Sequence, residues 1–279
     1  MEKSDLNFAT ETIERLRSEY NVDIITDWKE GSDGSWQGGL WTRDELERLQ
    51  RNINLFASAM GGSDRFAHNL DHVTIQKADI GSHGGEALAH RVSLSTKKTT
   101  KAWTMVHELA HAWDANHGWD LSVALEKYTG GRTNIVSGFL KRLFGRADAG
   151  LFMAGKEPGR HGRLPGCNAS GYFYGDKPSG SDWNFNRKED FAECVAMYLG
   201  WKKNNELSEW AEARISRHLH ENGERDSHFG VDNWADYKEY FYPDDGDYSK
   251  TLRWKFIDEL MAGRIKKPFG SIGGIQKEH

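Results

Sequence analysis

The spacing of apolar residues divides the chain into helical and extended segments. Phe8, Ile13 and Leu16 recur at helical spacing, and the β-branched residues 22–25 that follow are typical of a strand. In residues 88–95, one side of the pattern carries Leu88, His90, Val92 and Leu94, and the other carries Ala89, Arg91, Ser93 and Ser95. This alternation predicts a half-exposed strand. One more strand is predicted at residues 72–76, and helices are predicted over about residues 8–20, 42–60, 98–116, 121–128, 135–144, 207–220 and 251–261, with another that begins near residue 187.

This order of elements predicts an α+β fold. A small mixed sheet built from residues 22–95 is expected to pack against the helix at residues 98–116, and the second half of the chain is expected to be mostly helical. We expect one unit with elaborated ends, because single domains of this size are common. Its parts are the N-terminal helices and first strand in residues 1–66, a core in residues 67–265 and a loose tail in residues 266–279.

Local signals mark some of the boundaries. Thr42 and Glu45 have the spacing of a capping box at the start of one predicted helix, and Gly61 follows its end. The stretch from 145 to 180 holds many glycines and three of the five prolines, so it is predicted to form a loop over or beside a site.

Charge and composition exclude some classes of protein. The 37 basic and 42 acidic residues leave a net charge of -5, which offers no reason to expect nucleic acid, and we interpret the short basic run at residues 141–146 as a solvated helix end. Cys167 and Cys194 could form at most one bridge and are interpreted as ordinary thiols. The polar first ten residues do not form a secretory signal, and no run is long enough to span a bilayer. The chain is therefore expected to be cytoplasmic, or exported by a route without a classical signal.

The clearest chemical motif is His107-Glu108-Leu109-Ala110-His111, of the form H-E-x-x-H, inside the predicted helix at residues 98–116. Side chains four residues apart project from one face of a helix, so both imidazoles can reach one tetrahedral ion. Glu108 lies beside them, where a carboxylate can take a proton from a zinc-bound water and pass it to a leaving amine. The rival interpretation is a surface helix that happens to carry two histidines.

A catalytic zinc site needs a third protein ligand. Asp114 lies on the same helix, but a straight helix does not easily bring three consecutive turns to one ion, so a supporting or capping role is expected for it. His117 lacks the spacing by which a tight turn returns a third ligand. The favoured candidates are Glu189 and Glu193, at the start of a later helix.

Small residues support that choice. Ala196 and Gly200 follow Glu193 on the same helical face, and they are expected to let this helix approach the histidine helix closely. A charged N-terminal turn favoured by the helix dipole would explain Glu189 and Asp190 equally well, but not the small residues.

Together, His107-Glu-Leu-Ala-His-Ala-Trp-Asp114 and Glu189-Asp-Phe-Ala-Glu193 resemble the gluzincin metallopeptidases, and specifically the group similar to the anthrax lethal-factor catalytic domain. The resemblance covers residues 73–199 in the order of elements, with strong identity only in the two motifs. It implies a zincin-like fold for the core and one Zn²⁺ ion held by His107, His111 and Glu189. It also implies that Glu193 orients a ligand histidine, and that the chain is a toxin-like effector protease.

One position departs from the family pattern. The family usually carries a tyrosine seven residues before the ligand glutamate, where this chain has Asp182, with Trp183 beside it. The missing hydroxyl, which would stabilise the oxyanion, could come from Tyr172 or Tyr174, or its role could fall to His161. Ordinary loop packing is the alternative for both tyrosines.

The resemblance also implies a substrate. In gluzincin-like folds the strand before the zinc helix lies along the cleft and pairs with an extended peptide, and residues 87–95 occupy that place. The sequence thus predicts a zinc endopeptidase with Glu108 as general base and a protein or peptide substrate. A zinc hydrolase of another amide or ester, and an inactive zincin-like binding module, remain open, as does the oligomeric state.

Overall fold

The structure is a computed structural model that describes residues 3–98, 100–130, 132–133, 172–173, 186–212 and 246–265. For residues 3–4, 132–133 and 172–173 it describes the backbone alone. The described part combines helices with a small mixed sheet, as the sequence predicted. The predictions for residues 135–144 and 213–220 and for the tail 266–279 lie outside the described residues, as does the predicted loop at 145–180 apart from residues 172–173.

The central sheet has four strands in the order β1 (Val22–Ile24), β4 (Val73–Ala78), β6 (Arg91–Ser95) and β5 (Gly85–Leu88). The first three are parallel to one another, and β5 runs antiparallel to β6. Alternate residues of β4 are buried, which gives the sheet a core-facing side. Two small ribbons join β2 (Lys29–Glu30) to β3 (Trp36–Gln37) and β7 (Arg132–Thr133) to β8 (Tyr172–Phe173).

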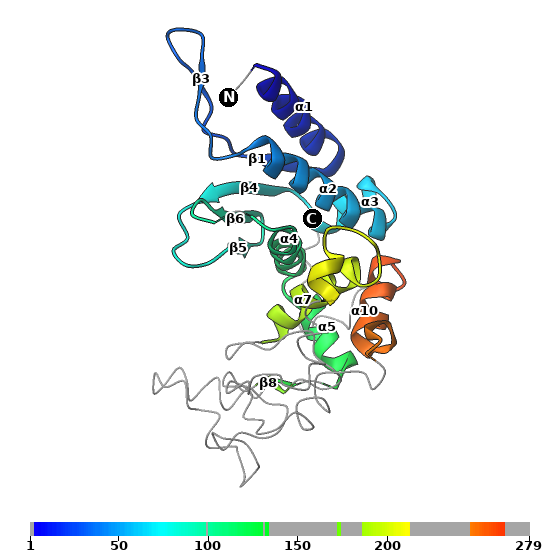
Figure 1. Ribbon diagram of the computed structural model, residues 1–279. Helices are drawn as coiled ribbons and strands as arrows, with labels where there is room; N and C mark the ends of the chain where they lie inside the picture. Colours follow the sequence, from blue (N-terminus) through cyan, green and yellow to red (C-terminus); the bar gives the residue numbers. More distant parts are fainter. Residues whose placement is uncertain are drawn as a thin grey trace, which may run out of the picture.

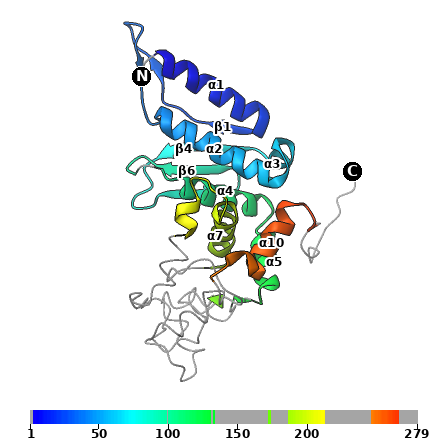
Figure 2. The ribbon, with the colours of Figure 1, turned by 45° about the vertical axis from the view of Figure 1, so that its right-hand side comes forward.

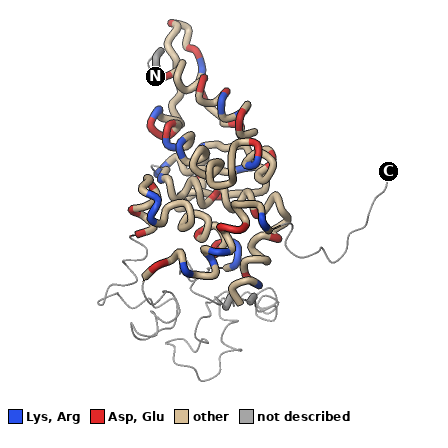
Figure 3. The backbone as a smooth tube through the Cα atoms, turned by 90° about the vertical axis from the view of Figure 1, so that its right-hand side faces the viewer, with Lys and Arg blue, Asp and Glu red and all other residues tan. Residues whose placement is uncertain are grey.

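The helices lie on two sides of this sheet. Figures 1 and 2 both show α1 above the sheet and α7, α5 and α10 below it. α4 packs against β5 and β6, as Figure 1 shows. Figure 3 shows acidic and basic residues interspersed along the described backbone. The helices are α1 (Lys3–Tyr20), α2 (Arg43–Met60), α3 (Ser63–Leu70), α4 (Ala102–Asn116), α5 (Asp120–Tyr128), α7 (Arg187–Gly200) and α10 (Leu252–Met261), with a 3₁₀ turn, η2 (Tyr248–Lys250), before the last.

A row of aromatic rings connects the two sides. The rings of Tyr20, Phe66, Phe56, Trp113 and Phe191 follow one another with centroids 5.6–5.8 Å apart. Because these residues come from α1, α3, α2, α4 and α7, edge-to-face and tilted ring contacts run from the N-terminal helix to the helix that begins near residue 187. The row positions α7 beside α4.

Several helix boundaries follow from the sequence signals. Thr42 and Glu45 form both hydrogen bonds of the capping box, which confirms that prediction, and Gly61 ends α2 with a φ of 93°. The short helix α3 and the β2–β3 ribbon were not predicted. α3 also runs across the expected boundary between residues 66 and 67.

The prediction of one strand over residues 88–95 is wrong. The chain turns at Ala89 and His90, so this region and the glycines before it form the hairpin β5–β6. β6 pairs with β4 on one side and β5 on the other, and therefore has no free edge. Among the described residues, the strand at the open edge beside α4 is β5.

Candidate metal centre

The H-E-x-x-H motif lies in the middle of α4, which is enclosed by its neighbours. Trp103, Val106, Leu109 and Trp113 are all buried, so apolar side chains surround the helix on most of its circumference. A helix that is apolar nearly all round is stable only inside a protein. His107 and His111 are consequently held in a poorly hydrated setting, with 14% and 11% of their side chains exposed.

The first turn of α7 brings Glu189 to the same place. Asn186 caps this helix, because its side-chain oxygen accepts hydrogen bonds from the backbone N–H groups of Lys188 and Glu189 at 2.9 and 3.4 Å. The cap positions Glu189 one turn into the helix, on the side that faces α4. An Asn–x–x–Glu spacing in the sequence is a capping signal that our sequence analysis missed.

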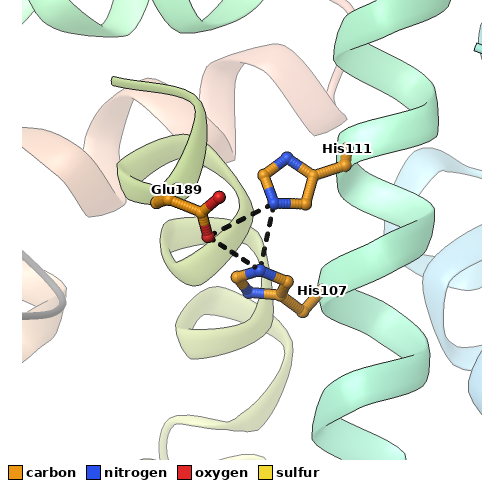
Figure 4. Close-up of side chains that lie close together, drawn as sticks. All are labelled: His107, His111 and Glu189. Carbon is orange, nitrogen blue, oxygen red and sulfur yellow. Dashed lines mark hydrogen bonds and ion pairs between the residues drawn. The ribbon is translucent and has the colours of Figure 1, made fainter. Parts of the chain in front are cut away.

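Three donor atoms converge between the two helices, as Figure 4 shows. Nε2 of His107 lies 3.0 Å from Nε2 of His111. Oε2 of Glu189 lies 3.2 Å from the first nitrogen and 3.4 Å from the second. Among the described residues, this is the group of histidine and acidic side chains that lies close enough together that it could hold a metal ion.

The triangle has the size that a tetrahedral zinc site requires. Bonds of about 2.0–2.1 Å at tetrahedral angles separate neighbouring donor atoms by about 3.3 Å. The three measured separations lie close to that value. Two imidazoles and one carboxylate are also a usual ligand set for catalytic zinc, with the fourth position left to water or substrate. The residues present therefore fit the ion that the motif implies.

The carboxylates around the two histidines favour a positive charge at this centre. Burial lowers the pKa of His107, but the carboxylates of Glu189 and Glu193 outweigh burial and raise it to about 10. Burial raises the pKa of Glu189, but hydrogen bonds to His107 and His111 outweigh it, and the net pKa lies well below its usual range. In the absence of an ion, a proton on an imidazole supplies the charge. A divalent cation would replace that proton.

Glu193 supports the centre from behind. Its Oε1 lies 3.1 Å from Nδ1 of His107 and accepts a hydrogen bond of 3.3 Å from Nε1 of Trp103. A carboxylate on the far nitrogen of a ligand histidine sets its tautomer and ring orientation. The orienting role of Glu193 stays a prediction, and Trp103 is a partner that the sequence analysis did not identify.

Glu108 points toward β5 and is buried. Burial raises the pKa of its carboxyl group, and the nearby Glu189 and Glu86 add to the increase, while His107 and His111 oppose it. Gly85 lies against it: a Cβ atom built on that glycine would lie 2.5 Å from Cγ of Glu108. The backbone of the edge strand is therefore in contact with the side chain of the predicted general base.

The rival ligands lie elsewhere. Oδ1 of Asp114 accepts a hydrogen bond of 3.0 Å from the backbone N–H of Ser122, so Asp114 caps the first turn of α5, which is the capping alternative for this residue. Burial raises the pKa of its carboxyl group. Nε2 of His117 lies 3.0 Å from the backbone oxygen of Asn69, away from the three donor atoms.

The expected role of the small residues is partly wrong. α4 and α7 do pack together, and Ala196 is fully buried. Gly200, however, faces Leu207: a Cβ on Gly200 would lie 2.7 Å from the backbone oxygen of that residue. The glycine allows the chain to turn back after α7, and it does not serve the approach to α4.

The side chains of the candidates for oxyanion stabilisation lie outside the part of the chain that the structure describes. Tyr172 lies in β8, of which only the backbone is described. Tyr174 and His161 lie outside the described residues, as do Asp182 and Trp183.

Comparison with known proteins gives no match to a family model, a curated protein or a solved structure. Within the described ranges, no helix has the length and apolar character to cross a membrane.

Proposed function

We propose that this chain is a zinc-dependent endopeptidase with a zincin-like fold, of the gluzincin type. The observation that carries the proposal is the triangle of Nε2 of His107, Nε2 of His111 and Oε2 of Glu189, with sides of 3.0–3.4 Å. These residues would hold one Zn²⁺ ion. When bound, zinc supplies a Lewis acid that lowers the pKa of a water molecule and polarises the substrate carbonyl.

Proton transfer and the orientation of a ligand fall to two glutamates of the chain. Glu108, buried beside the histidines, accepts the proton of the attacking water and returns it to the departing nitrogen. The upward shift of its pKa by burial suits a group that both takes and gives a proton. Glu193 keeps His107 oriented with Nε2 toward the centre.

The open edge of β5 supports a polypeptide substrate. The backbone N–H of Ser95 donates to the oxygen of Gly84 at 3.0 Å, and the register pairs Gly85 with Leu94. Hydrogen-bonded and non-bonded pairs alternate in an antiparallel ladder, so the backbone N–H and C=O of Gly85 and Ala87 point away from β6. An extended peptide could pair with these groups, and its backbone would then run beside Glu108.

Replacement of the general base tests the proposal. Glu108→Gln is expected to bind zinc as the parent does and to hydrolyse peptides about 10²–10⁴-fold more slowly, because it cannot accept a proton. Metal analysis and turnover of a diverse peptide library would be measured on both proteins. Glu209→Gln, on an exposed glutamate, is the control and should match the parent.

Three outcomes would count against the proposal. Hydrolysis at the parent rate by zinc-loaded Glu108→Gln would remove Glu108 from the mechanism. A zinc-loaded parent that cleaves esters or other amides but no peptide would favour the alternative hydrolase. A zinc-loaded parent that cleaves nothing would favour a binding module.

A further inference from the structure

Gly85, in β5, lies directly against the side chain of Glu108 on the motif helix. A Cβ atom at this position would lie 2.5 Å from Cγ, 2.7 Å from Oε1 and 2.8 Å from Cδ of Glu108. Carbon atoms that are not bonded to each other pack at about 3.5–4.0 Å. Any side chain at position 85 would therefore occupy the space that the Glu108 carboxylate now fills.

The requirement for glycine here is one of space. The φ of Gly85 lies outside the left-handed region, so an alanine could adopt the same backbone conformation. Gly85 also has a regular place in the ladder, opposite Leu94. The glycine allows the strand and the helix to approach each other closely, which is a common reason for glycine in a strand.

Glu108 has little room in which to move away. Its side chain is buried, with 7% of the residue exposed, and it projects from the same helix as the histidine pair. The position of Glu108 is thus determined from the strand side by the absence of a side chain at residue 85.

We propose that Gly85 is a positioning residue for Glu108. Because Gly85 has no side chain, the Glu108 carboxylate can lie against it. Gly85 also carries a backbone N–H and C=O that point away from β6. A peptide paired at Gly85 is then held directly beside the base. The catalytic part of this inference rests on the proposed function; the part about the position of Glu108 does not.

The neighbouring glycine offers a matched control. A Cβ on Gly84 would lie 3.5 Å from Cγ2 of Thr104, which is ordinary van der Waals contact, and its φ is likewise outside the left-handed region. Gly84→Ala therefore adds the same methyl group to the same segment without touching Glu108. Zinc affinity, crystal structure and peptide turnover would be measured for Gly85→Ala, Gly84→Ala and the parent.

We expect Gly85→Ala to keep a zinc dissociation constant within about twofold of the parent, because the three donor atoms are unaffected. Cγ of Glu108 should move by about 1 Å, which restores normal contact distance. Such a displacement of a reacting group is expected to lower kcat by about 10–100-fold, with KM less affected. Gly84→Ala should show none of these changes.

A crystal structure of Gly85→Ala with Glu108 in its parent position would overturn the proposal, as would turnover equal to that of Gly84→Ala. If the parent cleaves no peptide, the proposed function fails, but the crystal structure still tests the position of Glu108. If Gly85→Ala folds poorly, the double variant Gly85→Ala/Glu108→Ala decides. Recovery of its melting temperature to that of Glu108→Ala supports the contact, and a loss as large as in Gly85→Ala alone refutes it.

Discussion

Nδ1 of His107 lies 3.1 Å from Oε1 of Glu193, while Nε2 of the same ring lies 3.2 Å from Oε2 of Glu189. One imidazole is therefore held between two carboxylates that come from successive turns of α7. The two glutamates have different positions around it: Glu189 also reaches His111, and Glu193 also accepts from Trp103. Under the proposed function, this asymmetry separates Glu189 as a donor to the ion from Glu193 as a group that orients a donor.

The two glutamates are expected to differ in their effect on zinc. Glu189→Ala removes one of three donor atoms and should lower zinc affinity most. Glu193→Gln should retain zinc with an affinity about 10–100-fold lower, because the orientation of His107 is less well determined. Competition with a chromophoric chelator measures both, with Glu209→Gln as control. Loss of zinc in the Glu193 variant alone would exchange the two assignments.

Removal of zinc is expected to destabilise the protein. An ion that binds only the folded state stabilises it by about 4 kcal/mol when free zinc is 1,000 times its dissociation constant. Calorimetry with and without a chelator should therefore show a lower melting temperature for the parent after chelation. Glu189→Ala should respond much less, since its site lacks one donor. An equal response of both proteins would show that the stabilising ion binds elsewhere.

The ion-free protein is expected to lose stability as the pH rises through the alkaline range. The pKa of His107 is raised from 6.5 to about 10 in the folded protein, so its contribution is fully present below about pH 6.5 and disappears as the pH rises through about 10. The pKa of Glu189 is lowered from 4.5, so its contribution is present above about pH 4.5 and disappears as the pH falls through its folded pKa.

Urea unfolding in the presence of a chelator, at about pH 6 and about pH 9, tests this expectation. The free energy of unfolding should be lower at the higher pH, and the difference should shrink in His107→Gln. Zinc affinity should change in the opposite direction, because binding displaces a proton from the imidazole. An ion-free parent that is equally stable at both pH values would contradict the charge assignment.

A buried ion pair connects α10 to the start of α7. Nε and Nη2 of Arg253 lie 2.8 and 2.7 Å from the two carboxylate oxygens of Asp190, and both side chains are fully buried. Arg253→Met is expected to cost about 3–5 kcal/mol of unfolding free energy, because it leaves a buried carboxylate without its counter-charge. Urea denaturation would measure the loss.

Two further variants test whether burial of the Asp190–Arg253 pair causes the loss of stability. Arg264→Met removes a half-exposed arginine that pairs with Asp258, and should change stability by less than about 1 kcal/mol. The double variant Asp190→Leu/Arg253→Met should recover much of the loss, since apolar groups of similar volume can replace a buried pair. A loss in Arg264→Met as large as in Arg253→Met would mean that burial of the pair is not the cause.

Local sequence signals predicted the parts of the centre that lie within one helix. His107 and His111 face the same way because four residues make about one turn, whatever the helix packs against. The capping box of Thr42 and Glu45 is similarly a matter of neighbouring residues, and it formed as expected. Charge and hydropathy could identify neither the edge strand nor the neighbours of Glu108. Those depend on which segments meet.

The sequence by itself determined that His107, Glu108 and His111 lie within one helix, since helical periodicity acts over a few residues. The resemblance of a second motif also pointed to Glu189, but only the tertiary structure brings this residue, from a separate helix, to the two histidines. Only the tertiary structure decided that Asp114 caps α5 and that Gly85 lies against Glu108. Such contacts join segments far apart in the chain. They are set by the packing of whole side-chain surfaces, from the aromatic row to the buried Asp190–Arg253 pair, and no local pattern encodes that packing.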